Sequence, residues 1–223
     1  MSNKYCITIS RQFGSMGRPI GMKLAEELGI SFYDRNIVEE AASKLGLSLK
    51  LASDLEEREK SGFMYMMHPL GTGRSKELQE KLFCTEAQVI REYAARESCV
   101  IVGRCSDYLL MNEKNHINFY IFAPYAQRLK NCVERLHMTE DEAQRMISRV
   151  DSARDAYHKR YTRFKQEDLE YNNVMVDSSL LGIEGTARML ADIVKMKFPW
   201  AFSGDEPQTN IIEMKGTEKA FPF

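Results

Sequence analysis

Glycine and arginine residues gather in one short segment near the start of the chain. It reads Ser10-Arg11-Gln12-Phe13-Gly14-Ser15-Met16-Gly17-Arg18. A glycine turn that leads into a helix exposes backbone N–H groups at the positive end of the helix dipole, where an anion can bind. The segment therefore predicts a phosphate-binding turn. Its expected contact residues are Arg11, Gln12, Phe13, Gly14, Ser15, Met16, Gly17 and Arg18.

The turn departs from the usual phosphate-binding pattern G-x-x-x-x-G-K-[ST]. It lacks the lysine that would reach the β- and γ-phosphates and the hydroxyl residue that would hold magnesium. A glycine turn by itself can serve chain reversal only. Its place between the first strand and the first helix favours the phosphate-binding interpretation. We predict that Arg18 replaces the missing lysine, although a guanidinium needs a different approach to the phosphates.

Charged residues that follow apolar runs are candidates for binding a substrate. Arg104 follows a buried run, where an unpaired charge is costly, so it either recognises a phosphate or base or pairs with Asp107 or another carboxylate. Asp34 is expected to cap a helix, and Arg35 in the first turn could reach a phosphate. The predicted substrate-binding residues are Asp34, Arg35, Arg104, Asp107 and Arg128.

A helix expected after Thr139 carries several arginines. Glu142 completes a capping box with Thr139. Phosphoryl transfer depends on positive charge around the moving oxygens, which favours a lid role for these arginines, whereas a solvated charged helix is the alternative for each one. The predicted catalytic residues are Arg18, Arg149, Arg154 and Arg160. The four histidines show no metal-ligand spacing, and we assign them no chemistry.

Strands and helices that alternate along the chain would position these residues. Strands are expected at Tyr5 to Ser10, Ile30 to Tyr33, Cys99 to Val102, Asn118 to Ala123 and Val174 to Val176. Helices are expected to begin near Pro19, at Asp34, at Ser75, at Pro124, at Thr139 and at Ile183, with a flexible loop at 61–74. This alternation predicts a parallel sheet. Residues that follow its strands should meet at one edge.

Composition sets limits on the class of protein. The chain has 223 residues, with 31 lysines and arginines against 32 acidic residues, as in an ordinary globular protein without a broad nucleic-acid surface. Five cysteines without a C-x-x-C pair indicate reduced thiols. No segment has the apolar length of a membrane span. We expect a cytoplasmic protein that binds neither nucleic acid nor membrane, and the sequence leaves its oligomeric state open, a homodimer included.

Four segments resemble the cytidylate kinase-like family of bacterial proteins. They are Ile9 to Ser15, Phe32 to Arg35, Val100 to Tyr108 and Asp177 to Glu184, in matching order and spacing. The resemblance implies a three-layer P-loop NTPase fold with a parallel five-stranded sheet and helical monophosphate-binding and lid segments. It divides the chain into a kinase-like domain at 1–198, with an insertion at about 34–97 and a lid at about 138–165, and an irregular tail at 199–223.

The resemblance also implies an activity. True cytidylate kinases transfer the γ-phosphoryl group of ATP to CMP or dCMP with Mg²⁺, so ATP, Mg²⁺ and nucleotide substrates are expected. Arg104 corresponds to a substrate-binding arginine of those kinases. Gly17 stands where they have lysine and Pro19 where threonine helps to hold magnesium, while Val102 and Cys105 replace aspartates. Another small acceptor, or a nucleotide-binding regulatory protein that has lost catalysis, is the alternative.

Overall fold

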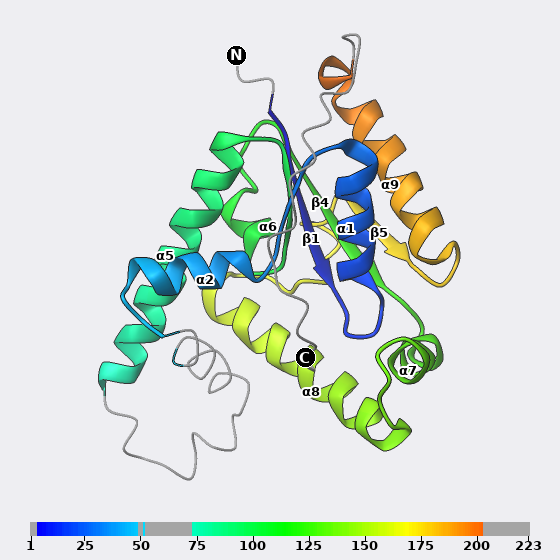
Figure 1. Ribbon diagram of the computed structural model, residues 1–223, viewed down its shortest axis with the longest axis horizontal. Coiled ribbons are helices and arrows are strands. Elements are labelled where there is room, and N and C mark those ends of the chain that lie inside the picture. The colour runs from blue at the N-terminus through cyan, green and yellow to red at the C-terminus, as the bar shows by residue number, and fades with distance from the viewer. Residues whose placement is uncertain (1–3, 49–50, 52–72, 203–223) are drawn as a thin grey trace.

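The computed structural model describes residues 4–48, 51 and 73–202 and contains a five-stranded parallel sheet (Figure 1). The strands are β1 (Cys6–Arg11), β2 (Ser31–Tyr33), β3 (Cys99–Val102), β4 (His116–Phe122) and β5 (Val174–Asp177), in the order β2-β3-β1-β4-β5. Every pairing is parallel. β1 is therefore the central strand, and the loop that follows it lies in the middle of the sheet edge.

Helices cover both faces of the sheet. Their bounds are α1 Gly17–Leu28, α2 Asn36–Lys44, α5 Gly73–Arg96, α6 Ser106–Leu109, α7 Tyr125–Glu134, α8 Glu140–Tyr161 and α9 Gly182–Lys197, and the short 3-10 helix η1 is Pro199–Ala201. α1 and α9 lie side by side on one face, and α5 and α6 lie on the other (Figure 1). The predicted three-layer P-loop NTPase fold is confirmed.

Alternation of side chains along the strands explains these layers. In β3, Val100 and Val102 belong to the core that α1 and α9 cover, whereas Cys99 and Ile101 belong to the core under α5. Successive side chains of a strand point to opposite faces, so an uninterrupted apolar strand must be covered twice. The continuous run at 99–102 reflects this environment.

The ends of several elements differ from the predictions. β1 includes Arg11, and α1 begins at Gly17 rather than near Pro19, so the loop shrinks to residues 12–16. Asp34 does not cap α2, because the N-cap residue is Arg35 and no side chain caps that helix. α5 begins at Gly73, which places Ser75 inside it. The cap at Thr139 is confirmed, because its side chain accepts a hydrogen bond from the Glu142 N–H.

The predicted segments map onto the fold as follows. The insertion at 34–97 contains α2 and α5, although residues 52–72 lie outside the described part of the chain. The lid segment at 138–165 contains α8, which runs past the carboxyl ends of the strands (Figure 1). The first residues of the predicted tail form η1, and the Trp200 and Phe202 rings contact that of Tyr5. Residues 203–223 lie outside the described chain.

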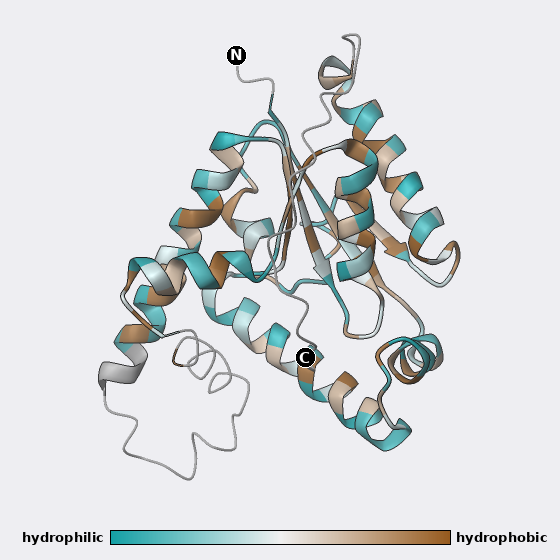
Figure 2. Ribbon diagram, in the orientation of Figure 1, coloured by the Kyte–Doolittle hydropathy of each residue, from teal (hydrophilic) through white to brown (hydrophobic). Residues whose placement is uncertain are grey.

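Hydrophilic residues predominate along much of α8, unlike the strands that end near it (Figure 2). Of the helices that the structure describes, none has the length and apolar character needed to cross a membrane.

Candidate functional site

The loop between β1 and α1 has the backbone of an anion-binding turn. Gly14 and Met16 have φ angles of 76° and 61°, both in the left-handed region. A side chain at Gly14 would approach the Arg128 carbonyl oxygen to 2.8 Å, so glycine is required there on two grounds. Met16 precedes α1 and forms no side-chain cap. The first N–H groups of α1 are therefore donors without a partner inside the helix, as a phosphate site requires.

Neighbouring elements fix the loop in place. Ser178 Oγ donates to the Ser15 carbonyl oxygen over 2.7 Å, and Asn131 Nδ2 donates to the Gly14 carbonyl oxygen over 2.8 Å. The Ser15 hydroxyl donates to the Gln12 and Ile121 carbonyl oxygens. The Gln12 side chain accepts from the Ala123 N–H over 3.2 Å. Side chains of the loop and of neighbouring elements thus use their hydrogen bonds to stabilise the turn. The backbone N–H groups of the loop are the groups that would bind a ligand.

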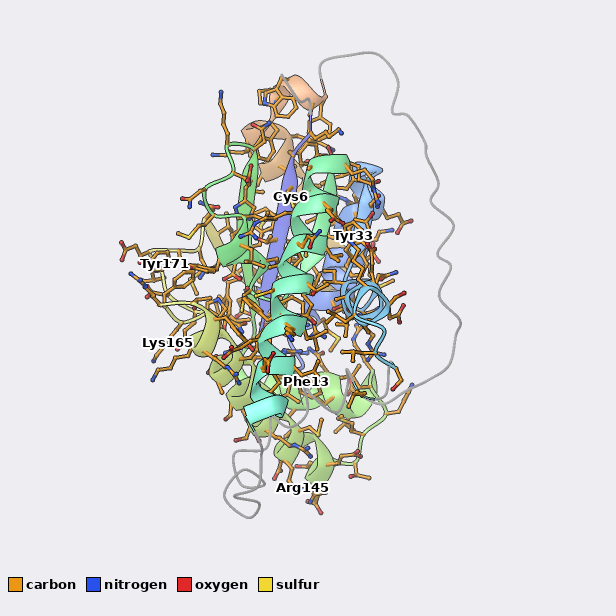
Figure 3. All side chains as sticks on the ribbon, turned by 90° about the vertical axis from the view of Figure 1, so that its left-hand side faces the viewer. Cys6, Phe13, Tyr33, Arg145, Lys165 and Tyr171 are labelled. Atoms are coloured by element: carbon orange, nitrogen blue, oxygen red, sulfur yellow. The ribbon has the colours of Figure 1, made fainter. Side chains whose placement is uncertain are left out.

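Helix α8, which lies in the predicted lid segment, contacts the loop through a carboxylate. Asp151 Oδ1 accepts a hydrogen bond from the Phe13 N–H over 2.7 Å. Arg128 forms an ion pair with Asp151 and donates to the Phe13 carbonyl oxygen over 3.3 Å. Figure 3 shows Phe13 toward the same end of the molecule as α8, with Arg145 farther from the sheet. The loop therefore already holds an anionic oxygen, flanked by a guanidinium.

Arg154 comes from the same helix and reaches the end of β1. Its Nη1 donates to the Arg11 carbonyl oxygen over 3.0 Å, and its guanidinium lies 6.0 Å from the Phe13 ring centre. Burial lowers the pKa of Arg154 to about 9, and the charge of Arg11 adds to the effect. The hydrogen bond brings Arg154 close to Arg11, so two cationic residues are neighbours where burial limits screening by water.

Arg11, Arg18 and Arg104 form a cationic cluster around Asp34. Burial raises the pKa of Asp34, but Arg11, Arg18 and Arg104 outweigh it and leave the pKa below its usual value. The Arg18 Nε donates to Asp34 Oδ2 over 2.7 Å. The positive charges that act on Asp34 thus outnumber its single negative charge, and this excess favours anionic ligands.

The turn after β3 has an unusual backbone. Gly103, Arg104 and Cys105 have φ angles of 76°, 61° and 53° in succession. Non-glycine residues rarely adopt this conformation, and such strain is concentrated at functional sites. The Arg104 guanidinium lies 3.8 Å from the buried Glu86 of α5, which also accepts from the Tyr157 hydroxyl over 3.0 Å. The alternative that Arg104 pairs with Asp107 or another carboxylate is thus confirmed, with Glu86 as the carboxylate.

Asp107 instead bonds to α8. Its Oδ2 lies 2.8 Å from His158 Nε2, and both side chains are almost completely buried. The other ring nitrogen of His158 lies 2.9 Å from the Phe164 carbonyl oxygen. This arrangement holds α8 against the turn after β3. Asp107 is therefore committed to a protein partner, and a direct contact with a substrate stays a prediction.

Comparison with known proteins identifies the family. Residues 6–180 match the cytidylate kinase-like family, which is more than half of the chain. The chain belongs to the cytidylate kinase-like family. The match includes the loop, the turn after β3 and the whole of α8. A search of curated protein sequences found no match.

Solved structures resemble this family member in fold. An uncharacterized protein from Eubacterium ventriosum ATCC 27560 is 23% identical, with 86% of this chain and 99% of that chain covered and a TM-score of 0.64. TT1252 from Thermus thermophilus is 14% identical, with 87% and 98% covered and a TM-score of 0.51. A shikimate kinase from Acinetobacter baumannii in complex with shikimate is 18% identical, with 86% and 92% covered and a TM-score of 0.44. Family membership and fold together support phosphoryl transfer of the P-loop kinase type.

The predicted arginines of this cytidylate kinase-like protein are only partly brought together. Arg154 lies at the loop, whereas Arg149 is exposed on α8. Arg160 donates to Gln79 of α5 over 3.3 Å. Arg35 is exposed at the start of α2. The spacing of Arg149, Arg154 and Arg160 thus distributes them around the helix.

Three residues of the site carried no role in the sequence interpretation: Glu86, Asp151 and His158. Asp151 precedes Arg154 by less than one helical turn, so the two share a face of α8, and that spacing was a usable signal. Glu86 and His158 are buried on long helices with polar neighbours in the sequence. Only the packing of the helices reveals their partners.

The family implies ATP and Mg²⁺ as ligands. The residues of the loop show whether a phosphate group and a magnesium ion would fit there. The Phe13 N–H already bonds a carboxylate oxygen, so the loop fits an anionic oxygen. For magnesium, Pro19 occupies the hydroxyl position, and the Ser15 hydroxyl is bonded to carbonyl oxygens. No group of three or more histidine, cysteine or acidic residues in the described chain could hold a metal ion. The loop thus fits phosphate, and it lacks the customary magnesium ligand.

Proposed function

We propose that this protein is an ATP-dependent kinase that phosphorylates a nucleoside monophosphate, with CMP or dCMP as the favoured acceptor. The cationic cluster beside the loop is the observation that carries the proposal. Arg18 donates to Asp34, and the charges of Arg11 and Arg104 also act on that carboxylate. Arg154 donates to the Arg11 carbonyl oxygen. A kinase must bring two anionic substrates together, and their repulsion is offset by fixed positive charge.

The reaction requires positioning more than covalent chemistry. The bond between the γ-phosphorus and the β–γ bridging oxygen breaks, a bond to the acceptor phosphate oxygen forms, and the leaving oxygen keeps its electron pair as ADP. We assign the loop amides and Arg154 to the ATP phosphates. Arg104 and Asp34 are assigned to the acceptor. Arg149 and Arg160 would reach a phosphate only after α8 moves.

Magnesium, when bound, would neutralise phosphate charge. Mg²⁺ commonly keeps several waters and binds through substrate phosphates with few protein ligands. The missing hydroxyl at Pro19 therefore makes the phosphates of ATP the main source of ligands in this proposal. The residues of the chain supply the remaining positive charge.

A coupled assay of ADP release tests the proposal. The wild-type protein is supplied with ATP, Mg²⁺ and each of CMP, dCMP, UMP, AMP, GMP and shikimate. Turnover with CMP or dCMP above the ATP-only background is the expected result. Arg104→Met should raise the KM for the acceptor more than the KM for ATP. If shikimate is the one acceptor in the panel that gives turnover, the acceptor is another small molecule and not a nucleoside monophosphate.

A nucleotide-binding protein without catalysis is the second candidate. The absence of a lysine and the Asp151 carboxylate on the Phe13 N–H favour it, because both reduce the positive potential at the loop. Calorimetry separates it from the first candidate. ATP binding without turnover of any acceptor would select the binding protein, and absence of ATP binding would exclude both.

A further inference from the structure

The lysine position of the loop faces the last residue of β1. An ideal Cβ placed on Gly17 would lie 2.6 Å from Arg11 Cβ and 3.0 Å from Arg11 Cγ. Carbon atoms that are not bonded do not approach so closely. With this backbone, only one of the two positions can carry a side chain. In this chain it is position 11.

The phosphate-binding pattern shows the same two positions with their residue types exchanged. In that pattern the first glycine and the lysine are as far apart in the sequence as Arg11 and Gly17 are here, so the glycine corresponds to Arg11 and the lysine to Gly17. The pattern has glycine first and the cation second, whereas this chain has the cation first and glycine second. The short distance between the two positions explains why both residues differ from the pattern together. A cation at position 11 requires glycine at position 17.

A second glycine provides space for the charged end of Arg11. An ideal Cβ on Gly103 would lie 2.2 Å from Arg11 Nη1 and 3.2 Å from Arg11 Cζ. The side chain therefore runs from the end of β1, past the first residue of α1, to the end of β3. A lysine that starts at the first turn of α1 would have to cross the same space.

In the described part of the chain, the Arg11 guanidinium has no carboxylate within ion-pair distance. Among the residues that the structure describes, no ion pair within 4.0 Å and no side-chain hydrogen bond involves it. Burial lowers the pKa of Arg11, Asp34 raises it, and Arg104 and Arg18 lower it again. An arginine stays protonated in proteins, and a cation that is partly withdrawn from water is costly without an anionic partner. The arrangement fits a ligand that brings the negative charge.

We propose that Arg11 takes the place of the phosphate-loop lysine and binds the β- and γ-phosphate oxygens of a nucleoside triphosphate. The inference rests on the proposed function and names a residue of that same site. Arg18, the substitute predicted from the sequence, is bonded to Asp34 and has 51% of its side chain exposed. Arg11 has neither constraint. Its planar guanidinium can bond two oxygens at once, which a lysine cannot do in the same geometry.

Calorimetric titration of the full-length protein with Mg²⁺ and ATP, ADP, AMP or CMP tests the proposal. Arg11→Met keeps the apolar stem and removes the charge. It should weaken ATP and ADP binding about 10- to 100-fold, as expected for the loss of a charged hydrogen bond, and leave AMP and CMP binding within about 3-fold. Arg18→Met should weaken ATP binding less. Arg188→Met, an exposed arginine of α9, should change nothing.

Exchanging the residues at positions 11 and 17 tests whether Arg11 acts through its charge or only by filling space. Gly17→Lys alone should lower the melting temperature and ATP affinity, because its Cβ collides with Arg11. Arg11→Gly alone should lose ATP affinity. The double variant Arg11→Gly/Gly17→Lys restores the order of the pattern, and it should recover at least 10-fold of the ATP affinity that Arg11→Gly loses. A purely structural role for Arg11 would give no such recovery.

Each result leads to a decision. Wild-type protein that binds none of the four nucleotides would overturn the proposed function and this inference with it. Wild-type protein that binds ATP, together with an Arg11→Met variant that binds ATP equally tightly, would overturn the inference alone. Loss of CMP affinity with unchanged ATP affinity would also overturn it, since it would assign Arg11 to the acceptor. If the exchange variants do not fold, the ratio of ATP to AMP affinity in Arg11→Met decides.

Discussion

The carboxylate of Asp151 accepts a hydrogen bond from the backbone N–H of Phe13 over 2.7 Å, and this bond joins α8 to the loop between β1 and α1. Arg128 completes the contact by pairing with the same carboxylate. The oxygen of Asp151 occupies the position that a ligand oxygen would take on that amide. A nucleotide that uses the Phe13 N–H must displace Asp151, and α8 would move when it does.

Asp151→Asn should therefore strengthen phosphate binding and weaken the fold. The substitution removes a negative charge from the loop and frees part of the Arg128 donor capacity, so ATP affinity should rise about 3- to 10-fold. Loss of the partly buried pair should lower the free energy of unfolding by about 1–2 kcal/mol, less than for a fully buried pair. Titration calorimetry and urea denaturation measure the two effects. Glu140→Gln, an exposed residue of the same helix, serves as the control. Unchanged or weaker ATP binding would contradict the prediction.

Gly103→Ala should displace the Arg11 guanidinium. The added Cβ would lie 2.2 Å from Arg11 Nη1, and the φ angle of 76° adds strain. The strain should cost about 1–2 kcal/mol of unfolding free energy, and ATP affinity should fall at least 10-fold. Gly29→Ala is a matched control, because Gly29 has a φ angle of 63° and open space around its Cβ position. The expectation fails if both variants bind ATP as the wild type does.

Removal of the Glu86 charge should affect stability and acceptor binding together. Glu86 is almost fully buried between Arg104 and Tyr157. Glu86→Gln keeps the shape and should lower the free energy of unfolding by about 1–3 kcal/mol, because Arg104 loses a charged partner. The KM for the acceptor should rise while the KM for ATP changes little. Glu92→Gln on the exposed side of α5 is the control. Equal changes in both KM values would argue against a role of Arg104 on the acceptor side.

His116 should make stability depend on pH below neutrality. Burial lowers its pKa to about 4, with Asp107 opposing the shift, and its Nε2 lies 2.6 Å from the Thr8 hydroxyl oxygen. Between pH 6.5 and 4 the unfolded chain binds a proton that the folded chain does not bind. The free energy of unfolding should therefore rise by about 3 kcal/mol across that range as pH increases, and then level off.

His116→Gln should reduce that slope in urea denaturation series. His137→Asn is the control, because His137 is exposed and asparagine tolerates its φ angle of 56°. A slope that His116→Gln leaves intact would assign the pH dependence to other groups.

Local sequence patterns were sufficient to predict most of the strands and helices of the fold. Continuous apolar runs such as 99–102 predicted buried parallel strands, because a strand covered on both faces needs apolar residues throughout. The cap at Thr139 and the glycine turn before α1 were also predicted from the sequence, since each depends on a few neighbouring residues. Element ends were less accurate. The boundary at Arg11 was set by pairing with Ile121 of β4, which lies far away in the sequence.

The sequence by itself determined that one P-loop chain contains a glycine loop, an arginine (Arg104) after a buried strand and an arginine-rich helix. Tertiary structure alone decided which residues meet. Asp34 was expected to cap a helix and instead pairs with Arg18, while Asp151 and His158 acquired partners on other elements. Packing also brought Gly17 and Gly103 against Arg11. The physical reason is that contacts between side chains depend on how separate elements pack, whereas spacing in the sequence fixes directions only within one element.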